Sequence, residues 1–82
     1  MSMRLYGYSK AAVAAAQSEP AEMAEVTLCA GPLALRKIAA FLEEAARLME
    51  TMGPAFDHLH LADRCAGFGD APAFVVSTPD QK

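Results

Sequence analysis

The segment between Gly31 and Gly53 constrains the fold of this 82-residue chain more than any other feature. Pro32 occupies the expected first position of a helix. A backbone N–H group at this position has no hydrogen-bond partner within the helix, so proline, which lacks this group, fits there. Gly53 and Pro54 together form a strong stop signal. At 100° per residue, the apolar side chains between these limits fill one continuous arc and the charged ones fill the opposite arc. The sequence therefore predicts an amphipathic helix over residues 32–52.

The apolar arc also predicts which face of this helix packs against the rest of the chain. Its members are Leu35, Ile38, Ala39, Leu42, Ala45, Ala46 and Met49, with Phe41 and Leu48 at one margin. Leu42 lies in the middle of the arc, so we expect it at the centre of the contact between the helix and a sheet. Replacing such a residue with alanine is expected to cost about 2–5 kcal/mol.

Four other segments alternate between apolar and polar residues with the period of two that is typical of β-strands. They are residues 3–8, 22–29, 55–61 and 73–77. Residues 10–21 form an alanine-rich connection, residues 62–71 a loop, and residues 79–82 a frayed tail beyond an ordered core of about residues 3–78. We expect a single α+β domain over residues 1–82, in the order β-β-α-β-β. The helix would cover one face of a four-stranded, mostly antiparallel sheet.

Composition excludes several classes of protein. The 54% of apolar residues includes 18 alanines, so the core is small and one domain is expected. Seven scattered basic residues against ten acidic ones argue against nucleic-acid binding. No apolar run approaches the roughly 18–20 residues that a membrane span requires, and the first residues lack the apolar stretch of a signal peptide. With only two cysteines, the chain fits a cytoplasmic protein whose thiols stay reduced.

One helix covers only one face of a sheet, so the other face of the predicted sheet is left open. We predict a partner-binding surface there, formed by Tyr6, Tyr8, Glu25, Thr27, Asp57, His58 and His60. Surfaces that mix aromatic and polar groups are often interfaces, with a different protein or with a second copy of the chain. A homodimer through this face or through a sheet edge is one such arrangement. The alternative is that the tyrosines and histidines simply pack beside one another.

The segment Asp57-His58-Leu59-His60 is the strongest candidate for site chemistry. Two histidines at positions i and i+2 of a strand point to the same side and could share a metal. A closed zinc site needs four ligands, however, and Asp63 and Cys65 are neighbours in sequence without a defined relative position. The plainer interpretation is two strand histidines on a polar face. We predict no metal, no cofactor and no catalytic residue, and thus a binding protein that is not an enzyme.

Four sequence pieces occur in an order that matches a known family. They are Leu5-Tyr6-Gly7-Tyr8-Ser9, Ala24-Glu25-Val26-Thr27-Leu28, the helical stretch from Pro32 to Leu42, and Asp57-His58-Leu59-His60-Leu61. Together they resemble immunity protein 32, a family of predicted immunity proteins from bacterial polymorphic toxin systems. The resemblance runs from Arg4 to about Val76. It implies a small α+β protein that binds and neutralises a toxin encoded next to it, and it identifies no catalytic residue.

Overall fold

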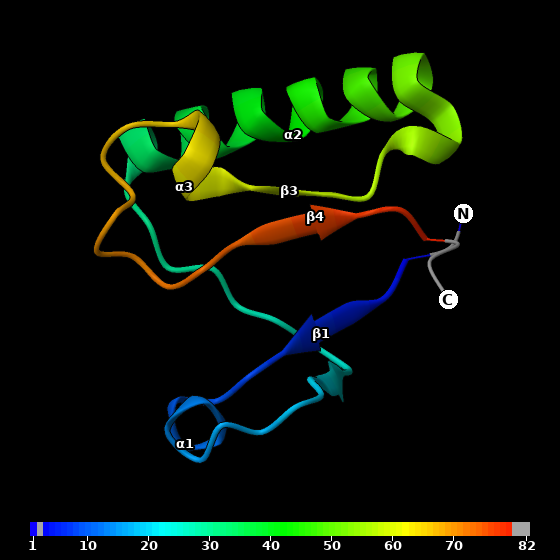
Figure 1. Ribbon diagram of the computed structural model, residues 1–82. Helices are drawn as coiled ribbons and strands as arrows, with labels where there is room; N and C mark the ends of the chain where they lie inside the picture. Colours follow the sequence, from blue (N-terminus) through cyan, green and yellow to red (C-terminus); the bar gives the residue numbers. More distant parts are fainter. Residues whose placement is uncertain (2, 80–82) are drawn as a thin grey trace.

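The computed structural model describes residue 1 and residues 3–79, so part of the predicted tail, residues 80–82, lies outside the described residues. The chain folds into an α+β structure, as expected, around one long helix (Figure 1). The elements are β1 (Leu5–Gly7), α1 (Lys10–Ala14), β2 (Ala21–Met23), α2 (Pro32–Met52), the 3-10 turn η1 (Gly53–Ala55), β3 (His58–His60), α3 (Leu61–Arg64) and β4 (Val75–Ser77). Figure 1 shows β3 and β4 next to α2, whereas β1 and α1 lie at the opposite end of the molecule.

Helix α2 has the bounds that the sequence predicts, Pro32–Met52. Pro32 lies in its first turn, and Gly31 precedes it without a side-chain cap. At the other end, the backbone N–H of Gly53 donates a hydrogen bond to the carbonyl oxygen of Met49. Gly53 adopts φ 55° and ψ −130°, a combination in which a Cβ atom is strongly disfavoured. The end of α2 therefore depends on glycine at this position.

Replacing Gly53 with alanine is expected to lower the free energy of unfolding by about 1–3 kcal/mol. A Cβ atom at this position meets no atom within 4 Å, so the cost comes from backbone conformation rather than from a clash. Urea unfolding followed by circular dichroism measures the change. Gly69→Ala is the matched control, because Gly69 has the same open surroundings without a positive φ. Equal losses for the two variants would contradict this account of the helix end.

The expected four-stranded sheet is not formed. The described strands make two separate antiparallel pairs, β1 with β2 and β3 with β4. In the first pair Leu5 lies opposite Met23 and Gly7 opposite Ala21, and in the second His58 lies opposite Ser77 and His60 opposite Val75. Each strand has three residues. The prediction of one continuous sheet with a helix on one face is therefore wrong, although the α+β class is right.

The segment after β2 explains why the sheet divides. The predicted second strand covers residues 22–29, but only its first two residues belong to β2. Residues 24–30 run from the end of the hairpin to the start of α2 and connect these two distant parts (Figure 1). Val26 and Leu28 are 64% and 50% exposed, so the alternation in this segment does not mark a buried strand face. A chain that has to bridge this distance is extended without being paired.

The core lies between α2 and the chain that follows it. Ile38, Phe41 and Leu61 form its centre, and partly buried apolar side chains pack against them: Leu59, Cys65, Phe68, Phe74 and Val76. The rings of Phe41 and Phe74 meet edge to face, with their centroids 6.3 Å apart. Ala45 and Phe56 are also buried. All of these residues lie in α2 or after it in the chain, so the β1–β2 hairpin contributes nothing to this cluster.

Helix α2 is rotated relative to the predicted contact. Phe41, at the margin of the predicted arc, is 1% exposed, whereas Leu42, its expected centre, is 44% exposed. Two physical causes favour the observed orientation. The phenyl ring buries more apolar area than a leucine side chain, and α3 packs on the Phe41 side of the helix through Leu61 and Cys65. The prediction that Leu42 occupies the centre of the contact is therefore wrong.

The chain is less compact than is typical of a folded domain of its length. The radius of gyration is 13.6 Å, against about 12 Å for a compact chain of this size. The difference fits a hairpin that lies away from the core, as Figure 1 shows for β1 and α1. Along this hairpin Tyr6, Tyr8 and Val13 are all exposed. The protein thus has one packed end and one thinly packed end.

Candidate functional site

The structure brings three of the predicted site residues together. Asp57 and His58 form a contact of 2.6 Å between the carboxylate oxygen Oδ2 and the ring nitrogen Nδ1. The rings of His58 and His60 meet at a steep angle, with their centroids 5.0 Å apart. The two histidines therefore share one side of β3, as their spacing predicts. Asp57 and His58 are exposed and His60 is half-buried, so this histidine cluster (Asp57, His58, His60) is available to a partner.

The other four predicted site residues lie elsewhere along the chain. Tyr6 is in β1 and Tyr8 just after it, and both are about half exposed. The hydroxyl of Tyr8 donates to the backbone oxygen of Ser18 at 3.3 Å, which ties the hairpin to its own connection. Glu25 and Thr27 are exposed on the linking segment. Because β1 and β3 belong to different two-stranded sheets, the seven residues do not share the face of one sheet.

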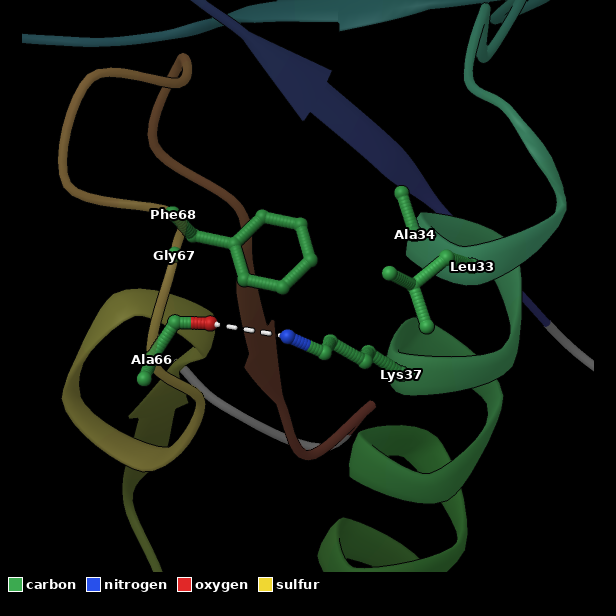
Figure 2. A pocket seen from close by; sticks show the side chains of 6 residues that line it. All are labelled: Leu33, Ala34, Lys37, Ala66, Gly67 and Phe68. Carbon is green, nitrogen blue, oxygen red and sulfur yellow. Dashed lines mark hydrogen bonds between the residues drawn. The ribbon is translucent and has the colours of Figure 1, made fainter.

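A shallow hollow of about 160 Å³ lies between the first turns of α2 and the loop after α3. Figure 2 shows its lining, which consists of Leu33, Ala34, Lys37, Ala66, Gly67 and Phe68. The ammonium group of Lys37 donates across it to the backbone oxygen of Ala66 at 3.4 Å. Small-molecule sites in proteins usually measure about 300–1,000 Å³, so this hollow is too small to be a typical ligand site. It is a feature that the sequence pattern did not predict.

A contact between α2 and α3 is a further feature that the sequence pattern did not predict. The guanidinium group of Arg64 donates two hydrogen bonds to the two carboxylate oxygens of Glu44, one of them from Nε at 3.2 Å. The hydrogen bonds from Arg64 lower the pKa of Glu44 below its ordinary value of 4.5. No sequence signal marks this pair, because its members lie 20 residues apart and α3 is too short to have a periodic pattern. The pair links α3 to α2.

Replacing Glu44 with glutamine is expected to reduce the sensitivity of folding to acid. A carboxyl group with a lowered pKa in the folded state stabilises the fold above its ordinary pKa of 4.5, and this contribution is lost as the pH falls through the lower, folded value. The melting temperature of the wild type should therefore fall more steeply than that of Glu44→Gln between about pH 5 and pH 3. Thermal melts at several pH values measure both slopes.

Glu50→Gln is the matched control for this prediction, since Glu50 is an exposed carboxylate on the same helix. It should leave the acid slope close to that of the wild type. The role of the Glu44–Arg64 pair would be refuted by parallel curves for the wild type and Glu44→Gln.

The described residues contain no group of three or more His, Cys, Asp and Glu side chains arranged to hold a metal ion. Within the described ranges, the two histidines on β3 therefore lack the further ligands that a closed zinc site needs. Cys29 is exposed, Cys65 is half-buried, and both are free thiols. What the histidine cluster does offer is hydrogen-bonding groups and two aromatic rings on an accessible surface. These are the groups that protein interfaces use.

None of the described helices is both long and apolar enough to cross a membrane. Comparisons with curated proteins and with solved structures found no match. The scan against family models, in contrast, matched immunity protein 32 over residues 25–77, which is 53 of the 82 residues. The match includes α2, the histidine cluster and β4, and it begins after the β1–β2 hairpin. The chain therefore belongs to the immunity protein 32 family.

Proposed function

We propose that this protein neutralises a toxin by binding it directly, in the bacterial cytoplasm, and that it catalyses no reaction itself. The observation that carries the proposal is the match to immunity protein 32 over residues 25–77. The resemblance implies a toxin encoded by a neighbouring gene and a binding protein that blocks it.

The histidine cluster is the surface that we assign to the toxin. It lies inside the matched range, on a strand that the core holds in place through Leu59. His58 and His60 offer ring nitrogens that can donate or accept hydrogen bonds, and Asp57 adds a carboxylate acceptor. Rings that are already in contact lose little conformational freedom when a partner covers them. The cluster thus combines a rigid base with polar recognition groups.

Neutralisation would then consist of covering the toxin's active site. The chain has a net charge of −3, so a toxin with a basic surface would be attracted over a distance and would bind faster. Glu25 and Thr27 lie within the matched range too and are exposed, which makes them candidates for contacts at the margin of the interface. Tyr6 and Tyr8 lie outside it and are the weaker part of the predicted surface.

Co-expression with the toxin-like product of the adjacent gene tests the proposal. The wild type should restore growth, and it should form a complex with the purified gene product. His58→Ala combined with His60→Ala is expected to weaken this complex at least about tenfold. Asp70→Ala, in an exposed loop, is the control and should bind like the wild type. If the double variant bound as tightly as the wild type, the histidine cluster would not be the interface. Failure of the wild type to bind or protect would overturn the proposed function.

A further inference from the structure

The rotation of α2 leaves an apolar face without a partner in the described part of the chain. Five residues form this apolar stripe: Leu35, Ala39, Leu42, Ala46 and Met49. Leu35 and Leu42 are 43% and 44% exposed, Ala39 and Ala46 are exposed, and Met49 is half-buried. Lys37, which contacts the loop after α3, and Glu44, which contacts α3, lie on a different side of the helix. The stripe therefore lies open along α2.

The spacing of the stripe is that of a helix-packing surface. Its members follow one another at intervals of four, three, four and three residues, which is the repeat that packs one helix along another. Large and small side chains alternate along it, so each leucine can insert beside an alanine of a neighbouring helix. From Leu35 to Met49 the stripe runs for about 21 Å. An occupant of this length and shape is itself an α-helix.

We propose that the occupant is α2 of a second copy of the chain, packed antiparallel about a twofold axis. In this arrangement Leu42 lies opposite Ala39 of the second copy, and Leu35 lies opposite Ala46. Met49 then falls opposite Pro32. Every layer of the contact is apolar and pairs a larger side chain with a smaller or less bulky one, so the stripe is complementary to itself in this register.

The charges beside the stripe favour the same arrangement. Arg36 and Glu43 flank it on the solvent side, both are exposed, and the ion pairs found among the described residues involve neither of them. In the antiparallel register Arg36 comes within reach of Glu43 of the second copy, and symmetry repeats the pair. A parallel arrangement about a twofold axis along the helices would place Arg36 and Glu43 of the two copies on opposite sides of the contact, too far apart to pair. The sequence thus specifies both the partner and the direction.

Sedimentation equilibrium of the wild type and two leucine variants tests this dimer. The wild type should associate at concentrations of tens of micromolar. Leu42→Lys should raise the dissociation constant at least about tenfold, because each copy places a lysine in the apolar contact. Leu33→Lys is the matched control, since Leu33 is exposed on the same helix away from the stripe. It should associate like the wild type. Equal weakening by both variants, or a monomeric wild type at several hundred micromolar, would overturn the proposal.

A charge exchange tests the direction of packing with variants that leave the apolar residues in place. Arg36→Glu alone and Glu43→Arg alone should each weaken the dimer, because each creates two like-charge pairs. The double variant should recover the affinity of the wild type, since it exchanges the two charges. Absence of this recovery would contradict the antiparallel register. The measurement uses the protein without any toxin, so its outcome is independent of the proposed function.

Discussion

Replacing Phe41 with alanine is expected to remove most of the stability of the protein. Phe41 is 1% exposed, lies at the centre of the core and meets the ring of Phe74 edge to face. Substitutions of this kind cost about 3–5 kcal/mol, through the lost apolar burial and the cavity that remains. A domain of this size has about 5 kcal/mol of total stability, so the variant should be largely unfolded near physiological temperature. Circular dichroism during urea unfolding measures the loss.

The neighbouring residue supplies the control for this prediction. Leu42 is 44% exposed, so Leu42→Ala should cost less than about 1.5 kcal/mol when measured at concentrations low enough to prevent association. The contrast between two adjacent positions depends only on which side of α2 faces the core. A larger loss for Leu42→Ala than for Phe41→Ala would mean that the helix is oriented as the sequence alone predicted.

Leu61→Ala is expected to have the second-largest effect on stability, about 2–5 kcal/mol. Leu61 is 3% exposed and stands at the junction of β3 and α3, where its backbone N–H donates to the carbonyl oxygen of Phe74 at 2.9 Å. The substitution keeps this backbone hydrogen bond but removes the side chain that joins α3 to α2. We therefore expect a lower melting temperature with the secondary structure retained below it.

Leu33→Ala is the matched control for Leu61→Ala, because it removes the same atoms from an exposed position on α2. Its melting temperature should stay close to that of the wild type. If Leu61→Ala melted at the wild-type temperature, Leu61 would not belong to the core, and the packing of α3 described above would be wrong.

Helix α2 could be predicted from the sequence because its signals are local. Pro32 near its start, Gly53 at its end and a continuous apolar arc act within a few residues of one another, and the structure confirms the bounds. The face that the helix buries could not be predicted in the same way. It depends on the size of Phe41 and on the position of α3. A helical wheel compares only the angular positions of residues, so it includes neither of these two factors.

The strands show where local patterns stop being informative. Alternation in residues 22–29 resembles a half-buried strand, yet Val26 and Leu28 are exposed because this segment bridges the hairpin and α2. Pairing in a sheet is decided by contacts between distant parts of the chain. Helix α3 has only four residues. This is about one helical turn, which is too short for a repeating apolar pattern to be recognised in the sequence.

Of the candidate site, only the part that depends on local geometry could be predicted. The spacing of His58 and His60 predicts a shared side of the strand, and their ring contact confirms it. The meeting of these histidines with Tyr6 and Tyr8 on one sheet depended on the four-stranded sheet, which does not form. The role of all seven residues in binding stays a prediction.

A titration is the direct test of the proposed toxin binding. The activity of the purified toxin-like product of the adjacent gene is measured while this protein is added in increasing amounts. We predict that the activity falls linearly to zero at a fixed molar ratio of the two proteins, as expected for a tight complex that covers the active site. Activity that stays undiminished in the presence of a large excess of the protein would contradict the claim.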